Sequence, residues 1–249
     1  AVSGMLVFPP FNGYSSMKDI ESMERVQMPK AILSWSGGKD SALALHEVRK
    51  AGDYEIQALL TTVTEAYDRS SMHGIRRPLM EQQAESIGLS LEEVLLSPVS
   101  SNEEYDARMR EILERYKAEG VSAVLFGDIF LEDVRKYREE RLASVGMKGI
   151  FPLWGRDTTE LARTFTQLGF KAVITCVDTE QMDSGYAGRA FDEEMLASLP
   201  AGVDPCGENG EFHSFVYDGP NITRAIPHTT GEVVLRDERF MFADLIPAK

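Results

Sequence analysis

The residues best suited to chemistry form a six-residue loop, SGGKDS at 36–41, between an apolar run and the first amphipathic stretch of the chain. A loop that joins a strand to a helix N-terminus presents free backbone N–H groups and the positive end of the helix dipole, so it favours anions. The two glycines allow close approach of phosphate oxygens, Lys39 adds a mobile positive charge, and Ser36 and Ser41 add hydroxyl groups. We therefore expect a phosphate site in which Asp40 orients the loop or holds Mg²⁺.

A second polar cluster lies in the sequence GENGEFH at 207–213. Its glycines allow a bent loop, and its other members offer hydrogen-bond acceptors, an amide and an imidazole that can exchange a proton near neutral pH. These groups could converge on one small polar substrate, or they could form a solvated hairpin, which the pattern alone favours. The residues concerned are Gly207, Glu208, Asn209, Glu211 and His213.

Further polar residues follow another apolar run, in the sequence GDIFLEDVRKYREER at 127–141. Asp128 stands where a strand would end, and ligands of open α/β sheets bind beyond the carboxyl ends of the strands. The charges after it are typical of a helix in which Glu132 and Lys136 form an i,i+4 pair, and most such charges lie on a solvated face. His73, in an expected loop, is a further candidate, although a lone histidine is more often structural than functional.

The elements that must position these residues alternate between short apolar runs and amphipathic stretches, which is typical of stacked strand-helix-strand units. A helix after the loop should end at Gly52, another should begin near Pro78, and Ser101 with Glu104 forms a capping box for a long helix. The sequence therefore predicts an α/β fold, with a parallel sheet covered by helices. The expected strands of this sheet are 31–35, 55–64, 91–97, 122–128 and 171–177.

Beyond Asp178 the pattern changes to one short helix near 191–198 and to strands within FHSFVYD, NITRAI and GEVVLRDERFMFADLI, separated by Gly, Pro and Asp turns. We expect a smaller C-terminal α+β portion that binds the substrate. The chain should then divide into an N-terminal extension, upstream or non-native, at 1–29, a phosphate-binding domain at 30–178 and the substrate domain at 179–249.

Composition limits the class of protein. The chain is 43% hydrophobic and 27% charged, and no apolar run approaches the roughly 20 residues of a spanning helix, so we expect no membrane span. The net charge of −14 disfavours a large nucleic-acid surface, because such surfaces depend on Lys and Arg. No secretory signal pattern is present, which predicts a cytoplasmic protein. Cys176 and Cys206 form no CxxC pair, so neither a disulfide framework nor a structural metal is expected.

The loop resembles the pyrophosphate loop (PP-loop), SGGxDS, of the ATP pyrophosphatase superfamily. The segments 127–141 and PCGENGEFHSFVYDGP at 205–220 resemble the signatures of one branch, the diphthine-ammonia ligase family, and the wording SMHG at 71–74 is similar to its bacterial-type members. The resemblance implies a Rossmann-like, HUP-type sheet with helices on both faces and an ATP-binding domain at 30–178. It also implies that ATP, assisted by Mg²⁺, adenylates a carboxylate with release of pyrophosphate, and that ammonia then forms an amide.

The partners implied are ATP, ammonia and a carboxylate substrate, which in archaea and eukaryotes is diphthine, a modified histidine of a translation factor; a homo-oligomer is compatible with the sequence. The catalytic residues implied are Lys39, Asp40, Glu208, Asn209 and Glu211, with Asp40 as the Mg²⁺ ligand. The ATP contacts implied are Ser34, Ser36, Gly37, Gly38, Lys39, Asp40, Ser41, Gly127 and Asp128. The substrate contacts implied are His73, Glu132, Tyr137, Glu140, Arg141, Gly207, Glu208, Asn209, Glu211 and His213.

Three alternatives stay open. The chain could be a relative that amidates a small acid, with a link to corrinoid metabolism, or a module that binds ATP without turning it over. It could also thiolate or otherwise modify tRNA, which the acidity and the missing CxxC pair disfavour. Cys206 could carry a persulfide in such chemistry, but a structural thiol is expected, because no partner cysteine or activating base is evident.

Overall fold

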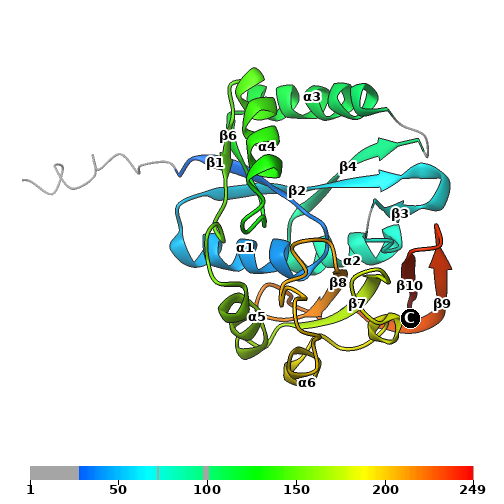
Figure 1. The fold of residues 1–249 in the computed structure, drawn as a ribbon. Helices are drawn as coiled ribbons and strands as arrows, with labels where there is room; N and C mark the ends of the chain where they lie inside the picture. Colours follow the sequence, from blue (N-terminus) through cyan, green and yellow to red (C-terminus); the bar gives the residue numbers. More distant parts are fainter. Residues whose placement is uncertain (1–27, 72, 98–100, 249) are drawn as a thin grey trace, which may run out of the picture.

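The computed structural model describes residues 28–71, 73–97 and 101–248, and the expected N-terminal extension therefore lies outside them except for its last two residues. The first sheet contains five parallel strands (Figure 1): β4 and β1 both pair with β2, β5 pairs with β1, and β6 pairs with β5. A short strand, β3, pairs antiparallel with the end of β2. The strands are β1 (Lys30–Ser34), β2 (Glu55–Thr64), β3 (Arg69–Ser70), β4 (Ser90–Leu96), β5 (Val121–Leu125) and β6 (Lys148–Ile150).

Helices cover both faces of this sheet, as predicted. Side chains alternate between the two faces of a strand, so Ala31 and Leu33 of β1 pack with α1 and α2, while Ile32 packs with α3 and α4. The capping box at Ser101 is present, because the Ser101 hydroxyl accepts a hydrogen bond from the Glu104 N–H at 3.2 Å. The helices are α1 (Lys39–Ala51), α2 (Arg77–Ile87), α3 (Asn102–Ala118) and α4 (Glu132–Ser144), and a 3₁₀ turn, η2, spans Glu65–Tyr67.

A second, antiparallel sheet forms the C-terminal part, with the strand order β8-β7-β10-β9. The assignment of 171–177 to the parallel sheet was wrong, because β7 pairs antiparallel with β8 and β10. A buried apolar run has the same sequence character in either sheet. The remaining elements are α5 (Thr158–Gln167), β7 (Lys171–Asp178), η3 (Ser184–Tyr186), α6 (Glu193–Ala197), β8 (Phe212–Asp218), β9 (His228–Arg236) and β10 (Phe240–Pro247).

The segment NITRAI at 221–226 is not the strand that its composition predicts. Its backbone is irregular because it packs against helices: the Asn221 side chain donates to the Ala42 carbonyl at 2.7 Å, and the Thr223 N–H donates to the Ser86 carbonyl at 3.1 Å. A division of the chain after residue 178 stays a prediction, and the pairing of β7 favours an earlier boundary.

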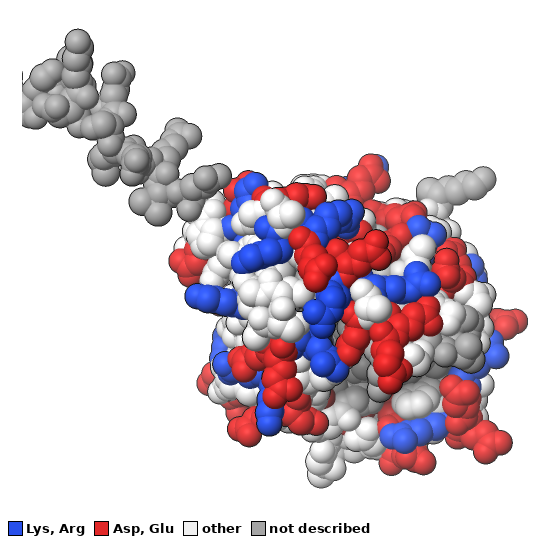
Figure 2. All heavy atoms as spheres, turned by 90° about the horizontal axis from the view of Figure 1, so that it is seen from above, with Lys and Arg blue, Asp and Glu red and all other residues white. Residues whose placement is uncertain are grey.

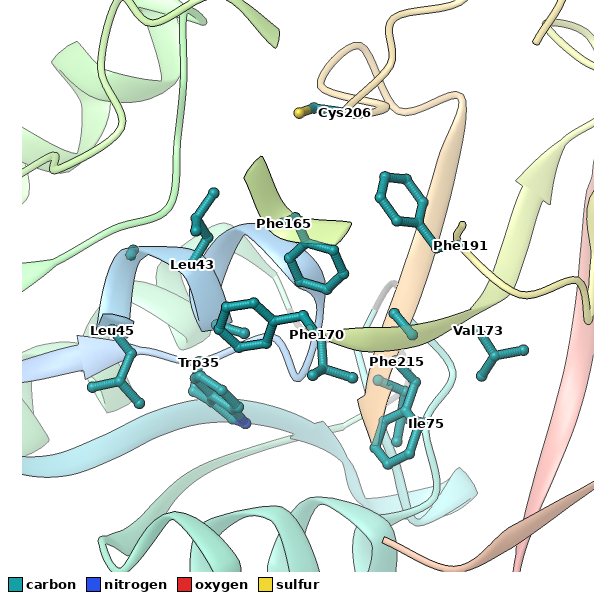
Figure 3. Close-up of a cluster of buried hydrophobic side chains, with 14 of the residues drawn as sticks. Trp35, Leu43, Leu45, Ile75, Phe165, Phe170, Val173, Phe191, Cys206 and Phe215 are labelled. Atoms are coloured by element: carbon teal, nitrogen blue, oxygen red, sulfur yellow. The ribbon is translucent and has the colours of Figure 1, made fainter. Parts of the chain in front are cut away.

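One hydrophobic core joins the two sheets (Figure 3). Phe165 and Phe170 stack with ring centroids 4.8 Å apart, and Phe191 meets Phe165 edge-on at 5.5 Å. Leu43 of α1 lies beside these rings, so the helix that begins at the phosphate-binding loop packs directly on the second sheet. The loop and the second sheet are therefore fixed relative to each other by burial of large apolar groups.

Within the described residues, no helix has both the length and the apolar character needed to cross a membrane. Acidic and basic side chains are interspersed over the face that carries α3 and α4 (Figure 2).

Candidate active site

The loop at 36–41 is held in shape by its own hydroxyl groups. The Ser36 hydroxyl accepts from the Gly38 N–H at 3.2 Å and contacts the Ser41 hydroxyl at 3.1 Å, and Ser41 also donates to the Gly38 carbonyl at 3.0 Å. Gly37 has a φ of +77°, which favours glycine. Helix α1 begins at the loop without a side-chain cap from Gly38, the Lys39 N–H donates to the Ser214 hydroxyl of β8 at 3.2 Å, and residues 38–41 line the cleft.

Gln83, a residue that sequence reasoning missed, ties this loop to α2 and to the second sheet. Its amide donates to the Gly37 carbonyl at 3.0 Å and to the Val216 carbonyl at 2.6 Å, and its oxygen accepts from the Trp35 indole at 3.0 Å. Gln83 is fully buried on an otherwise apolar helix face. Because a buried amide needs all of these partners, Gln83 fixes the loop from behind.

Lys39 is buried and fixed, which corrects the expectation of a mobile charge. Its ammonium donates to Asp40 Oδ2 at 2.8 Å and to the carbonyl of Cys206, and only 4% of the residue is exposed. Burial alone would lower the pKa of Lys39, but the neighbouring Asp40 raises it overall, so the ammonium stays charged. Burial raises the pKa of Asp40 despite the attraction of Lys39.

Gly127 and Asp128 follow β5, which ends at Leu125, three residues before the expected end of this strand, and both line the cleft beside the loop. A Cβ on Gly127 would lie 2.8 Å from the Asp40 carbonyl carbon, so only glycine allows this approach. Asp128 Oδ2 lies 2.9 Å from Nε of Arg138, which stacks over the Phe126 ring at 4.4 Å. Sequence reasoning missed Arg138, although it stands at the helical spacing of core-facing residues.

The loop at 204–211 brings Glu208 to the same place. Glu208 Oε1 accepts from the Ile129 N–H at 2.7 Å and thereby joins this loop to the segment after β5. Burial, together with repulsion from Asp40 and Asp128, raises the pKa of Glu208 to about 7. Its carboxyl group can therefore exchange a proton near neutral pH.

Glu211 and Asn209 position this loop and do not line the cleft around Glu208. Glu211 is buried, and its Oε1 accepts from the Asp204 N–H at 2.9 Å and from the Asn209 amide at 3.0 Å. Asp204, which the sequence analysis did not single out, accepts from the Cys206 N–H at 2.8 Å. The Cys206 thiol is buried, and burial raises its pKa, which fits a structural thiol.

His73 and His213 meet with ring centroids 4.4 Å apart. Burial, followed by the proximity of His213, lowers the pKa of His73 well below its ordinary value. Burial also lowers the pKa of His213 to about 4, so both rings are neutral at pH 7.

These residues line two adjoining compartments of one cleft. The polar compartment, about 270 Å³, is lined by Ser36 and residues 38–41 of the loop, with Asp128, Glu208 and His213, whereas Gly37 lies against α2 and does not line it. The apolar compartment, about 240 Å³, lies between α3, α4 and the ends of β1, β2 and β5. The residues that line both are Ser34, Ser36, His73, Phe126 and Arg138.

The remaining predicted substrate contacts lie on helix α4, and only two of them face the cleft. Tyr137 and Arg141 line the apolar compartment, where both contact Asp106 of α3, at 2.8 Å and 2.7 Å. Glu132 and Glu140 are exposed and line neither compartment. Lys136 pairs with Glu140 at 3.9 Å, and this contact replaces the expected pair with Glu132.

Two family models match the chain. The diphthamide synthase N-terminal domain matches residues 29–149, and the diphthamide synthase C-terminal domain matches residues 157–235. The two matches together contain every residue of the polar compartment. Strand β10 lies beyond them.

Curated relatives are similar to the chain at low identity. The diphthine-ammonia ligase of Danio rerio is 26% identical over 227 residues, which cover 82% of this chain and 88% of the relative. The diphthine-ammonia ligase of Schizosaccharomyces pombe is 24% identical over 218 residues, but the chain spans only 36% of its length. A solved structure, the predicted subunit of tRNA methyltransferase from Methanocaldococcus jannaschii, is 18% identical with a TM-score of 0.39, over 58% of this chain and 77% of that one.

Proposed function

The chain belongs to the diphthine-ammonia ligase family, and on this premise we propose that it is an ATP-dependent ligase that forms a carbon-nitrogen bond. One observation carries the proposal: Lys39 and the first turn of α1 face the same polar compartment as Glu208, whose pKa of about 7 suits proton transfer. Lys39 and the first turn of α1 suit a departing pyrophosphate, and the carboxyl group of Glu208 suits an attacking amine.

ATP would span the two compartments. The adenine would enter the apolar compartment, where aromatic and aliphatic side chains of β5, α3 and α4 offer contacts. The phosphates would lie on the loop at 36–41, where backbone N–H groups, the helix dipole and Lys39 all favour negative charge. The α-phosphate would then face Glu208 and Asp128.

The reaction would take place in two steps. A carboxylate oxygen of the substrate attacks the α-phosphorus, and the bond to the β-phosphate breaks to release pyrophosphate. Lys39 and the loop stabilise the charge that develops on this leaving group. Ammonia then attacks the acyl carbon, AMP departs, and Glu208 accepts the proton that the new amide must lose.

Mg²⁺ would be held jointly by the nucleotide and the protein. A nucleotide-bound Mg²⁺ needs only one or two carboxylates besides phosphate oxygens and water, and Asp40 and Asp128 both line the polar compartment. Among the residues that the structure describes, no three His, Cys, Asp or Glu side chains cluster as a metal site. A cation here would therefore depend on phosphate for its other ligands, and it would offset the charge of the phosphates beside Asp40.

The test measures products rather than binding. Full-length protein is incubated with ATP, Mg²⁺ and an ammonium salt, with either a diphthine-bearing translation factor or a panel of small carboxylic acids, and AMP, pyrophosphate and amide are quantified. We expect the three products in equal amounts with one of these substrates. ATP binding without AMP formation under every condition would overturn the ligase assignment and favour a nucleotide-binding module.

A further inference from the structure

Strand β9 forms an open edge of the second sheet. It stands last in the strand order β8-β7-β10-β9, at the outer side of the molecule (Figure 1), and among the described residues it pairs only with β10. Its nine residues include neither proline nor lysine, which commonly protect such edges. An open edge of this length presents unpaired N–H and C=O groups to another strand.

Hydrogen bonds at the β9–β10 turn show which way the backbone groups point. The Thr179 N–H donates to the Arg239 carbonyl at 3.0 Å, so Arg239 is directed at β7 and the next residue, Phe240, is directed at β9. Phe240 lies opposite Arg236, whose carbonyl accepts from the Arg239 N–H at 3.0 Å. The backbone groups of Arg236 therefore point to β10.

The free backbone groups of the edge belong to Val233 and Leu235. The pairing with β10 keeps one register from Val233 to Arg236, and backbone groups alternate in direction along a strand. Val234 is therefore directed at β10, as Arg236 is, and the two residues between and beside them are directed outward. The Val233 and Leu235 side chains are also 48% and 50% exposed. Free hydrogen-bonding groups and apolar surface thus coincide at the same two residues.

The charges beside these residues complement themselves. Glu232 precedes Val233, Arg236 follows Leu235, and both charged residues are exposed. In an antiparallel pair of two β9 strands with Val234 on the twofold axis, Glu232 of each copy lies opposite Arg236 of the other. Val233 of each copy then lies opposite Leu235 of the other, and the outward backbone groups can exchange hydrogen bonds.

Neighbouring registers with the same hydrogen-bonding pattern lack this match. A twofold axis at Val233 sets each charged residue opposite an uncharged one, and an axis at Leu235 brings Glu232 towards Glu238 of the turn. Opposite charges across two strands stabilise the pair, and like charges destabilise it. The axis at Val234 is therefore favoured, and the partner that fits this edge is a second copy of the same strand.

We propose that the chain forms a twofold dimer in which residues 232–236 of β9 pair with the same residues of a second copy and join the two antiparallel sheets. Val233 and Leu235 of both copies would form an apolar cluster on one face of the joined sheet. An edge of this length is small beside a standard interface of about 1,600 Å², so we expect dissociation in the micromolar range. No residue of β9 lines the cleft, so the inference does not depend on the proposed ligase activity.

Sedimentation equilibrium of the full-length protein at several concentrations tests the pairing and its register. Glu232→Arg sets Arg opposite Arg at both ends and should raise the dissociation constant of the dimer about tenfold or more. Adding Arg236→Glu exchanges the two charges and should return the constant to within about threefold of the wild type. A double variant that does not recover, or a wild type that stays monomeric at the highest concentration, would overturn the proposal.

Leu235→Lys should prevent dimer formation, because it places a charge in the apolar cluster. Ile246→Lys is the matched control: Ile246 is 40% exposed in the same sheet, but it lies on β10, outside the proposed pairing, so the dimer should persist.

Amide hydrogen exchange gives a second, residue-specific measurement. The N–H groups of Val233 and Leu235 should exchange more slowly as the protein concentration rises, whereas the Val234 N–H, which faces β10, should be protected at every concentration. A dimer in which Val233 and Leu235 exchange at the monomer rate would place the interface elsewhere and overturn the proposal. Protection of the same groups in a monomer would overturn it too, because the chain itself would then cover the edge.

Discussion

The loop at 36–41 and helix α4 both supply polar side chains to the cleft, but they hold them differently. Lys39 and the loop backbone are bonded to groups far away in the sequence, such as Gln83 and Cys206, and are buried. The charges of α4 pair mostly within the helix or with α3, and several are exposed. A loop that is fixed before the ligand arrives can stabilise a transition state, because no reorganisation is needed, whereas α4 can contribute only the one face that meets the cleft.

Lys39→Met tests the loop side of this comparison and should have the largest effect. The substitution removes the buried positive charge that faces the departing pyrophosphate, so we expect pyrophosphate release to fall about 100-fold or more. A pyrophosphate-coupled assay at saturating ATP checks this, and the thermal midpoint shows whether the variant is folded. Release within threefold of the wild type in a folded variant would show that the loop does not stabilise the leaving group.

Glu208→Gln tests the link between the loop and the segment after β5. With a pKa of about 7, the wild-type carboxylate gains its basic form as pH rises, so kcat should rise through pH 7. The Gln variant should lose this rise and about 100-fold or more of kcat, which is typical for removal of a general base. A pH profile that keeps its inflection near 7 in the variant would assign the titration to another group.

The same substitution has a consequence for stability. Burial raises the pKa of Glu208 above the ordinary value of 4.5, so its contribution to stability is fully present below pH 4.5 and is lost as pH rises through about 7. Gln cannot ionise. The thermal midpoint of Glu208→Gln should therefore rise relative to that of the wild type as pH increases from 5 to 8. A difference between the two midpoints that does not depend on pH would contradict the raised pKa.

The loop could be predicted from sequence because its chemistry is local. The glycines, the hydroxyl groups and the position before a helix are all visible in six letters. Strands β1, β2 and β4 were placed to within a residue or two for the same reason. The antiparallel pairing of β7 and the irregular path at 221–226 depend on what each segment packs against, which no local pattern contains.

Gln83 and Arg138, which sequence reasoning missed, share a pattern by which they could have been identified: each is a polar residue at a core-facing position of a helix. Gln83 stands among Leu79, Met80 and Ala84 on the buried stripe of α2, and Arg138 stands four residues from Leu142 on the inner face of α4. A long polar side chain at a core-facing helical position needs a buried partner. Glu132 and Glu140 became candidates through the family resemblance alone, and their role as substrate contacts stays a prediction, although both are exposed and line neither compartment.

Arg138→Met tests the inner face of α4 and should have an intermediate effect. It leaves Asp128 unpaired near Asp40 and Glu208, so the repulsion that raises the pKa of Glu208 increases. We expect the inflection of the kcat profile to move to higher pH and kcat at pH 7 to fall by up to about tenfold. Arg135→Met is the matched control, because Arg135 pairs with Glu139 and stacks on Trp154 without lining the cleft.

Glu132→Gln and Glu140→Gln test the outer face of α4 and should have the smallest effects. Glu140 is exposed and its pair with Lys136 is long, and such surface pairs contribute about 0 to 1 kcal/mol. We expect KM for ATP, kcat and the thermal midpoint to stay within about twofold or two degrees of the wild type. A selective rise in KM for a protein substrate, with unchanged KM for a small acid, would instead show that this face contacts a macromolecular partner. Helix α4 would then contribute to specificity through the residues that lie outside the cleft.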